Sequence, residues 1–264
     1  MRTDFDRAYV TAHGKVAVLA LNHPEMLNAA SARMMRGLRA AMDHIEAGGF
    51  RAIVLTGEGR GFCSGASLAE PPEPKPDGSA SGAGDALEHT YHPFLRRLRD
   101  TSLPVVCAVN GAAAGIGMSF ALMGDLVIAA RSAYFLQAFS RIGLVPDGGS
   151  TWLLPRLIGL ARARELALLA EKLSAERALQ WGLINRVADD EQLMEEALAL
   201  GERLANGPAA LSSTRKLFWD SPHNTFEAQM ALEAATQQQV CQTEDFMEGL
   251  GAFLQKRPAN FQGK

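Results

Sequence analysis

Cysteine is scarce in this chain, and what there is does not form a recognisable framework. Cys63, Cys107 and Cys241 are an odd number of thiols with no CxxC spacing among 264 residues. Such a pattern fits reduced thiols rather than a set of disulfides. The first residues, MRTDFDRAYV, carry acids where a secretory signal needs an apolar core. We therefore expect a cytoplasmic location, with Cys63 as an inert thiol.

Long apolar runs and an excess of charge of one sign are also missing. No run approaches the ~20 apolar residues of a membrane-spanning helix. The 26 Lys and Arg are balanced by 29 Asp and Glu, which leaves a net charge of −3 and no basic stripe. The composition predicts neither a membrane protein nor a nucleic-acid partner.

Several catalytic motifs are absent. The glycines of the segment 57–65 do not follow the GxGxxG spacing, so a dinucleotide site is disfavoured. The sequence contains no GxSxG elbow and no HExxH. His89 and His92 in HTYH lack a third ligand nearby in the sequence, so no metal site is expected.

Apolar patterning predicts an α/β core followed by helices. Short apolar runs at 15–21, 52–56, 105–109 and 126–129 alternate with helical periodicity, which is typical of parallel pairing. From residue 161 helical segments dominate, at 161–170, 175–181, 191–205, 209–218, 224–240 and 243–254. We expect a core over 1–200 and a helical region over 201–264. The Pro-, Gly- and Ser-rich segment 70–84 is predicted to be mobile, as a lid or a plain insertion.

Two glycine-rich turns and one acid suggest a site. The turns at 62–67 and 110–117 each follow a strand-like run and could direct main-chain N–H groups at a shared oxygen. A helix starting near Gly117 would add its positive end. Asp147 stands in Val-Pro-Asp-Gly-Gly with apolar residues on both sides, among them Ile142, Leu144 and Val145. By residue type the turn can be structural, but a desolvated Asp147 would have a raised pKa suited to a general base.

The order of motifs along the chain resembles the crotonase superfamily, the enoyl-CoA hydratases and isomerases. The run LNHPEMLNA, the turns FCSGAS and NGAAAGIG, the segment FSRIGLVPDGGSTWLLPR, the run LSAERALQWGLINRV and the ending FLQKRPANFQGK carry the resemblance over nearly the whole chain. The PDGGSTWLLPR segment and the tail look most like the 1,2-epoxyphenylacetyl-CoA isomerases of phenylacetate catabolism and the Δ3,Δ2-enoyl-CoA isomerases.

The resemblance implies a spiral of ββα units, a helical C-terminal part that trimerises, and an acyl-CoA thioester as substrate. It implies a homotrimer or homohexamer, and no cofactor beyond the coenzyme A of the substrate. The thioester oxygen would be held by the N–H groups of Ala66 and Ile116. Other substrate-binding positions carried over from the family are Met26, Leu27, Ala29, Ser64, Ser67, Leu68, Gly115, Ser119, Phe139, Phe253 and Lys256. Phe253 and Lys256 would reach the coenzyme A of a neighbouring subunit.

Departures from the family pattern favour isomerisation. The two glutamates of true hydratases fall on Ser119 and Phe139, which cannot do that acid–base chemistry, whereas Asp147 occupies the position of the isomerase acid. Ile116 replaces a common Gly and reshapes the pocket, and Ser67 replaces a common Asp. Three alternatives remain: a hydratase-like lyase with Asp147 acting alone, a catalytically inactive protein that binds coenzyme A, and an acyl-CoA hydrolase or dehalogenase.

Overall fold

The computed structural model describes residues 1–70, 78–79 and 82–264. Its strands are β1 Arg2–Phe5, β2 Ala8–His13, β3 Val16–Leu21, β4 Ala52–Gly57, β5 Gly61–Cys63, β6 Val105–Val109, β7 Ala112–Ala114, β8 Leu126–Ala130, β9 Tyr134–Leu136, β10 Leu173–Ser174 and β11 Arg186–Ala188. Its α-helices are α1 Ala32–Ala47, α2 Ala83–Ala86, α3 His92–Asp100, α4 Ile116–Ala121, α5 Ser150–Leu169, α6 Ala175–Trp181, α7 Leu193–Ala205, α8 Ala210–Asp220, α9 Phe226–Val240 and α10 Glu244–Gln255. The predicted mobile segment 70–84 lies largely outside the described residues.

The strands form two sheets, and successive units of the chain contribute to both. The large sheet has the order β1-β2-β3-β4-β6-β8-β11, and the small sheet has the order β10-β9-β7-β5. The pairs from β3 through β4, β6 and β8 to β11 are parallel, as the sequence predicts. β4, β6 and β8 lie in the large sheet, and the strand that follows each of them lies in the small sheet. This repeated strand–strand–helix order is the predicted spiral.

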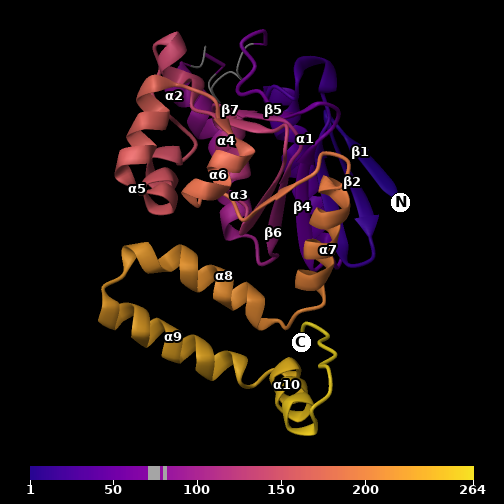
Figure 1. The fold of residues 1–264 in the computed structure, drawn as a ribbon. Helices are drawn as coiled ribbons and strands as arrows, with labels where there is room; N and C mark the ends of the chain where they lie inside the picture. The colour runs from indigo at the N-terminus through magenta and orange to yellow at the C-terminus, as the bar shows by residue number, and fades with distance from the viewer. Residues whose placement is uncertain (71–77, 80–81) are drawn as a thin grey trace.

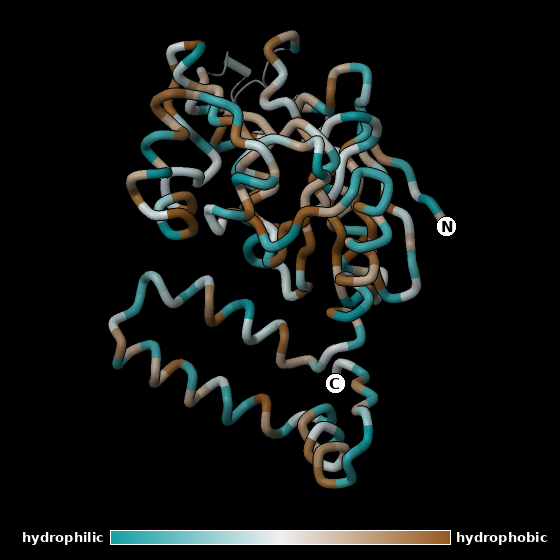
Figure 2. The backbone as a smooth tube through the Cα atoms, viewed as in Figure 1, coloured by the Kyte–Doolittle hydropathy of each residue, from teal (hydrophilic) through white to brown (hydrophobic). Residues whose placement is uncertain are grey.

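Burial explains which segments form the core. Every residue of β3, β4 and β6 is buried. Burial on both faces of a parallel sheet explains why these short sequence runs are mostly apolar and do not alternate with polar residues. Helix α1 is capped by Ser31, whose side chain accepts the N–H of Met34, and it buries one face, including Met35, Leu38 and Met42. In Figure 2 the hydrophobic colours concentrate in the strands, and the C-terminal helices alternate between hydrophobic and hydrophilic.

Helices α8, α9 and α10 extend away from the sheets (Figure 1). Arg215 attaches α8 to the core, because its buried guanidinium donates to Asp125 at 2.7 Å and to the carbonyl oxygen of Thr101 at 2.7 Å. Trp219 of α8 also stacks on Trp152 of α5, with ring centroids 6.0 Å apart. Large apolar side chains remain exposed on α9 and α10, namely Phe226, Met230, Phe246, Met247, Leu250, Phe253 and Leu254. A homotrimer or homohexamer that would cover them stays a prediction.

Of three expectations about elements, one was wrong, one was incomplete and one was confirmed. The turns predicted at 62–67 and 110–117 contain the short strands β5 and β7. The helix expected at 161–170 matches the part of α5 that follows the kink at Gly159, whereas the part that starts at Ser150 was not predicted. The helix expected near Gly117 is confirmed, since α4 starts at Ile116 and runs for six residues.

Candidate active site

The two glycine-rich turns lie side by side. β5 and β7 are neighbouring parallel strands, so the turns that follow them leave the small sheet at the same edge. Gly115 has a φ of +52°, which favours glycine, and a Cβ placed there would stand 3.7 Å from the Cα of Gly65. The two main chains therefore approach each other where the sequence places both candidate donors.

The N–H of Ala66 points away from Ala30, the residue whose main chain holds the Ala66 segment. Ala66 forms an isolated parallel bridge with Ala30, in which Ala30 donates to the carbonyl oxygen of Gly65 at 2.7 Å and accepts the N–H of Ser67 at 2.8 Å. In a parallel bridge one residue bonds to both neighbours of its partner, so the partner's own N–H faces the opposite side. Over the described residues the N–H of Ala66 has no acceptor.

The N–H of Ile116 is free for a different reason. Ile116 is the first residue of α4, and the N–H groups of the first helical turn have no acceptor within the helix. In the part of the chain that the structure describes, this N–H makes no other hydrogen bond, whereas the next turn is closed by Met118 donating to Gly115 at 3.0 Å. Ala66 and Ile116 thus supply two N–H groups on adjoining main chains that have no acceptor among the residues the structure describes.

Asp147 is tied to the same short helix. Its carbonyl oxygen accepts the hydroxyl of Ser119 at 3.1 Å, the hydroxyl of Ser150 at 2.7 Å and the N–H of Ser150 at 3.0 Å. Ser119 stands three residues after Ile116, which places both residues on one face of α4. The structure therefore brings all three predicted catalytic residues together around α4.

The carboxyl group of Asp147 is desolvated. Its Oδ1 is buried, and within the described ranges it has no hydrogen-bond partner. Burial raises the pKa of Asp147 to about 6, and the nearby His92 opposes the rise. The predicted source of this burial was partly wrong, because Ile142, Leu144 and Val145 are exposed. Leu153 and Leu154 of α5, which are apolar residues on the other side of Asp147 in the sequence, are buried.

Sequence reasoning missed Tyr91, which lies beside these groups. A π-helical turn over Leu87–Tyr91 separates α2 from α3, and Tyr91 is buried. Its hydroxyl donates to the carbonyl oxygen of Ala30 at 3.1 Å. Burial, and to a smaller degree the Asp147 charge, raises the pKa of Tyr91 to about 12. The HTYH motif did not predict that Tyr91 lies beside the candidate site, because a π-helical turn has no recognisable sequence spacing.

Ser119 and Phe139, which stand at the positions of the two hydratase glutamates, cannot act as general acid or base. Ser119 is fully buried and donates to the Asp147 main chain, and Phe139 is buried with its ring 3.8 Å from where a Cβ on Gly115 would stand. Phe139 therefore forms apolar wall next to the Gly115 turn.

Two of the predicted coenzyme A segments adjoin each other. Ser64 donates its N–H to Leu27 at 3.0 Å and its hydroxyl to Met26 at 3.2 Å. Met26 and Leu68 are exposed beside this junction, whereas Ala29 is buried. Phe253 and Lys256 stand at the end of α10, which Figure 1 places at the far end of the molecule from β5 and β7. Their contact with coenzyme A of a neighbouring subunit stays a prediction.

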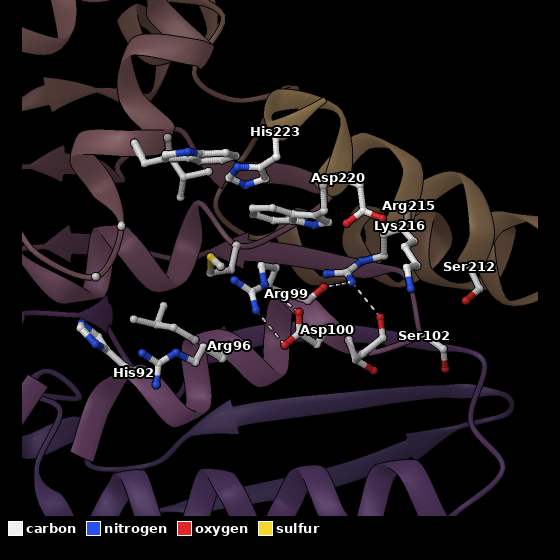
Figure 3. Close-up of a pocket in the computed structure, with 18 residues that line it drawn as sticks. His92, Arg96, Arg99, Asp100, Ser102, Ser212, Arg215, Lys216, Asp220 and His223 are labelled. Carbon is white, nitrogen blue, oxygen red and sulfur yellow. Dashed lines mark hydrogen bonds and ion pairs between the residues drawn. The ribbon is translucent and has the colours of Figure 1, made fainter. Parts of the chain in front are cut away.

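A cavity of about 810 Å³ opens between the core and α8 (Figure 3). His92, Gly148 and Gly149 form its end next to Asp147, and Trp152 and Trp219 line it further along. Its arginines are already paired: Arg96 with Glu88, Arg99 with Asp100 and Arg215 with Asp125. Lys216 adds a further basic side chain to the lining, so the cavity borders the Asp147 turn and carries several basic groups.

The other thiol, imidazole and carboxylate groups in the described chain do not indicate a second catalytic or metal site. Cys63 is buried, and this burial raises its pKa to about 12, so its thiolate is disfavoured. His92, singled out with His89 in the sequence, contacts Glu88 at 2.8 Å. Within the described residues, no group of three or more His, Cys, Asp or Glu is placed to hold a metal ion. No helix there is long and apolar enough to cross a membrane.

Gly148 offers a direct test of the Asp147 turn. Both Gly148 and Gly149 have a positive φ, but a Cβ on Gly148 would come within 2.7 Å of Ser119, whereas one on Gly149 meets nothing within 4 Å. We expect Gly148→Ala to displace Asp147 and to lower kcat for any reaction in which Asp147 transfers a proton by at least about tenfold. Gly149→Ala, the matched control, should cost only about 1 kcal/mol of stability from its backbone conformation. Equal kcat values for the two variants would contradict this placement.

Comparison with known proteins identifies the family. The profile described as enoyl-CoA hydratase/isomerase matches residues 11–264. The chain belongs to the enoyl-CoA hydratase/isomerase family. A Rhodobacter capsulatus protein named probable enoyl-CoA hydratase is 47% identical over 94% of this chain and 95% of its own length. The 1,2-epoxyphenylacetyl-CoA isomerase of Escherichia coli is 45% identical, with the same coverage of both chains.

Solved structures of the family share the fold. An enoyl-CoA hydratase subunit from Geobacillus kaustophilus superposes with a TM-score of 0.90 at 32% identity, covering 99% of this chain and 100% of that one. A protein from Streptomyces coelicolor described as a putative enoyl-CoA hydratase gives a TM-score of 0.89 at 33% identity, with 99% and 96% coverage. This member of the hydratase/isomerase family is an enzyme with the crotonase fold and a helical C-terminal region.

Proposed function

We propose that this enzyme is an acyl-CoA isomerase, which shifts a double bond or rearranges a ring by proton transfer with Asp147 as the base. One observation carries the proposal: Asp147 has a buried oxygen that finds no hydrogen-bond partner among the described residues, and it is held by Ser119 on the helix that begins with Ile116. A base and an oxyanion donor are thereby fixed to one rigid element.

The chemistry needs only these groups. Asp147 removes a proton from a carbon next to the double bond, and the electron pair moves into a dienolate whose charge rests on the thioester oxygen. The N–H groups of Ala66 and Ile116 hold that oxygen, and protonated Asp147 returns the proton at another carbon. No water is consumed, and the substrate and product are isomers.

Hydration is the second candidate, since the Rhodobacter capsulatus relative is named a probable enoyl-CoA hydratase. Hydration divides the work between two acids in this family, and the corresponding positions hold Ser119 and Phe139. The name of the Escherichia coli relative favours isomerisation, and an aromatic acyl group of the phenylacetate type is the substrate it suggests. We expect the enzyme to work as a homotrimer or homohexamer in the cytoplasm, without an added cofactor.

A pair of substrates tests the function. We expect the enzyme to convert trans-3-hexenoyl-CoA to the 2-enoyl isomer and to leave crotonyl-CoA largely unhydrated, as followed by the ultraviolet absorbance of the conjugated thioester. Rapid hydration of crotonyl-CoA would favour the hydratase. Binding of coenzyme A with no turnover of aliphatic or aromatic thioesters would identify an inactive binding protein. Release of a free thiol would indicate hydrolysis.

The raised pKa of Asp147 predicts a pH dependence. The carboxylate accepts a proton only when ionised, so kcat/KM should fall about tenfold per pH unit below a midpoint of about 6 and be level above it. A pH–rate profile of hexenoyl-CoA isomerisation measures this midpoint. His92→Gln should move it upward, because the charge of His92 opposes the raised pKa. A profile that stays flat down to the ordinary pKa of an aspartate would contradict the assignment.

A further inference from the structure

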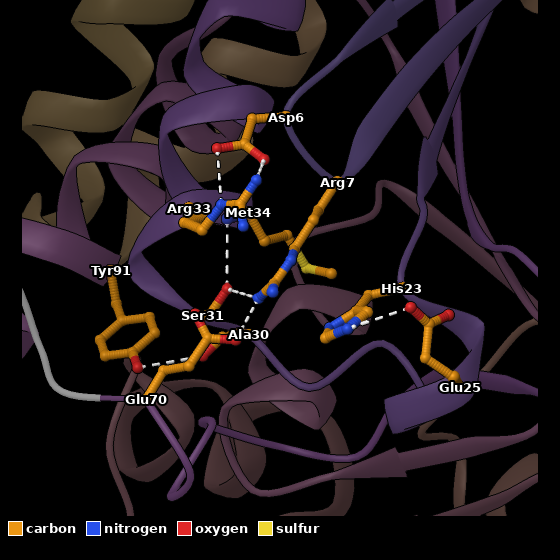
Figure 4. Close-up of polar contacts among 10 residues, drawn as sticks. All are labelled: Asp6, Arg7, His23, Glu25, Ala30, Ser31, Arg33, Met34, Glu70 and Tyr91. Atoms are coloured by element: carbon orange, nitrogen blue, oxygen red, sulfur yellow. Dashed lines mark hydrogen bonds and ion pairs between the residues drawn. The ribbon is translucent and has the colours of Figure 1, made fainter.

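Two side chains from distant parts of the chain hold the residues that support Ala66 (Figure 4). The Tyr91 hydroxyl donates at 3.1 Å to the carbonyl oxygen of Ala30, the same oxygen that accepts Ser67 N–H at 2.8 Å. One residue further on, Arg7 donates from Nη1 to the Ser31 hydroxyl oxygen at 2.8 Å. The segment whose bonds orient Ala66 is thus fixed from two sides.

Arg7 also binds the far end of the loop that carries Ala66. The same Nη1 donates to the carboxylate of Glu70, and both side chains are partly buried. The main chain of Arg7 is itself fixed, because its carbonyl oxygen accepts the N–H of Asn22 at 2.9 Å. Arg7 therefore connects the start of α1, at Ser31, with the end of the Ala66 loop.

We infer that Arg7, with Glu70, and Tyr91 are positioning residues that set the direction of the Ala66 N–H. The inference rests on the proposed function, in which that N–H binds a thioester oxygen. The main chain on both sides of Ala66 is bonded to Ala30, through Gly65 and Ser67, so the direction of the Ala66 N–H depends on what holds Ala30. A displacement of about 1 Å at a reacting centre can cost 10²-fold in rate, so loss of either support lowers catalysis.

A neighbouring ion pair provides a matched control. Arg33 pairs with Asp6 at 3.0 Å, and it stands on the first turn of α1 close to Ser31 (Figure 4). This pair is more exposed than Arg7–Glu70, and Arg33 hydrogen-bonds neither Ala30 nor Glu70, so its charge acts on Glu70 only through space. Arg33→Met therefore removes an arginine and an ion pair from the same region and leaves the supports of Ala66 in place.

The test combines kinetics with the infrared band of a bound thioester. Hexanoyl-CoA labelled with ¹³C at its carbonyl has no double bond to move, and polarisation by the two donors shifts its carbonyl band to lower frequency. In Arg7→Met, Glu70→Gln and Tyr91→Phe, we expect this shift to shrink and kcat for hexenoyl-CoA to fall about tenfold, with KM within threefold. Arg33→Met should match the wild type. Arg7→Lys should recover most of kcat, because one ammonium can donate to both acceptors of Nη1.

The outcomes separate this inference from the proposed function. If the wild-type enzyme does not shift the band, Ala66 is no oxyanion donor and both fail. If the wild type shifts it, while the three variants keep the shift and a kcat within twofold, only the positioning roles are wrong. Should Arg7→Met fail to fold, Tyr91→Phe decides, because it deletes a single oxygen. Asp147→Asn should keep the full shift, since the base does not touch the thioester oxygen.

Discussion

Asp147→Asn is expected to lower kcat for hexenoyl-CoA isomerisation by about 10³-fold. The amide has nearly the same shape but cannot accept a proton from carbon, and no second acid stands at the positions of Ser119 and Phe139 to replace it. Steady-state and single-turnover rates at pH 8 measure the loss, because the wild-type carboxylate is then fully ionised.

The stability of that variant serves as its control. Burial disfavours the ionised carboxylate of Asp147, so the neutral amide should leave the protein at least as stable as the wild type at pH 8. Thermal unfolding and coenzyme A affinity close to wild type would show that chemistry alone was lost. Retention of more than a tenth of wild-type kcat would show that another group is the base.

Ile116→Pro is expected to lower kcat/KM by about 10²-fold to 10³-fold, the typical effect of deleting one oxyanion donor. Proline has no N–H, and its fixed φ suits the first position of a helix, which is where Ile116 stands. The substitution therefore removes the donor while leaving α4 able to form. The comparison is made on hexenoyl-CoA isomerisation.

Ile116→Ala separates the donor from the side chain. Both variants lose the buried Ile116 side chain, but only the proline variant loses the N–H. We expect Ile116→Ala to stay within about tenfold of the wild type and the proline variant to fall at least tenfold further. Equal losses in the two variants would assign the effect to packing and would remove Ile116 from the donors.

The sequence predicted most of the large sheet and fewer parts of the small one. Val105–Val109 was found as predicted, because five consecutive apolar residues between turns have few other stable arrangements. Gly61–Cys63 and Ala112–Ala114 gave no such signal, since a run of only three residues beside glycines also fits a tight turn. These two strands nevertheless bring the donor turns together, so the site depends on the elements that were hardest to predict.

The sequence by itself determined the alternation of strands and helices in the large sheet and the small residues at both donor turns, and its family resemblance indicated that the two hydratase glutamates are replaced and that Asp147 is the remaining acid. Those properties depend on residue type and local spacing. Only the tertiary structure decided that the N–H of Ala66 faces away from Ala30, that Tyr91 lies beside the site, and that Asp147 has a pKa of about 6. Hydrogen-bond direction and desolvation are set by groups that are distant in the sequence, so they exist only once the chain has folded.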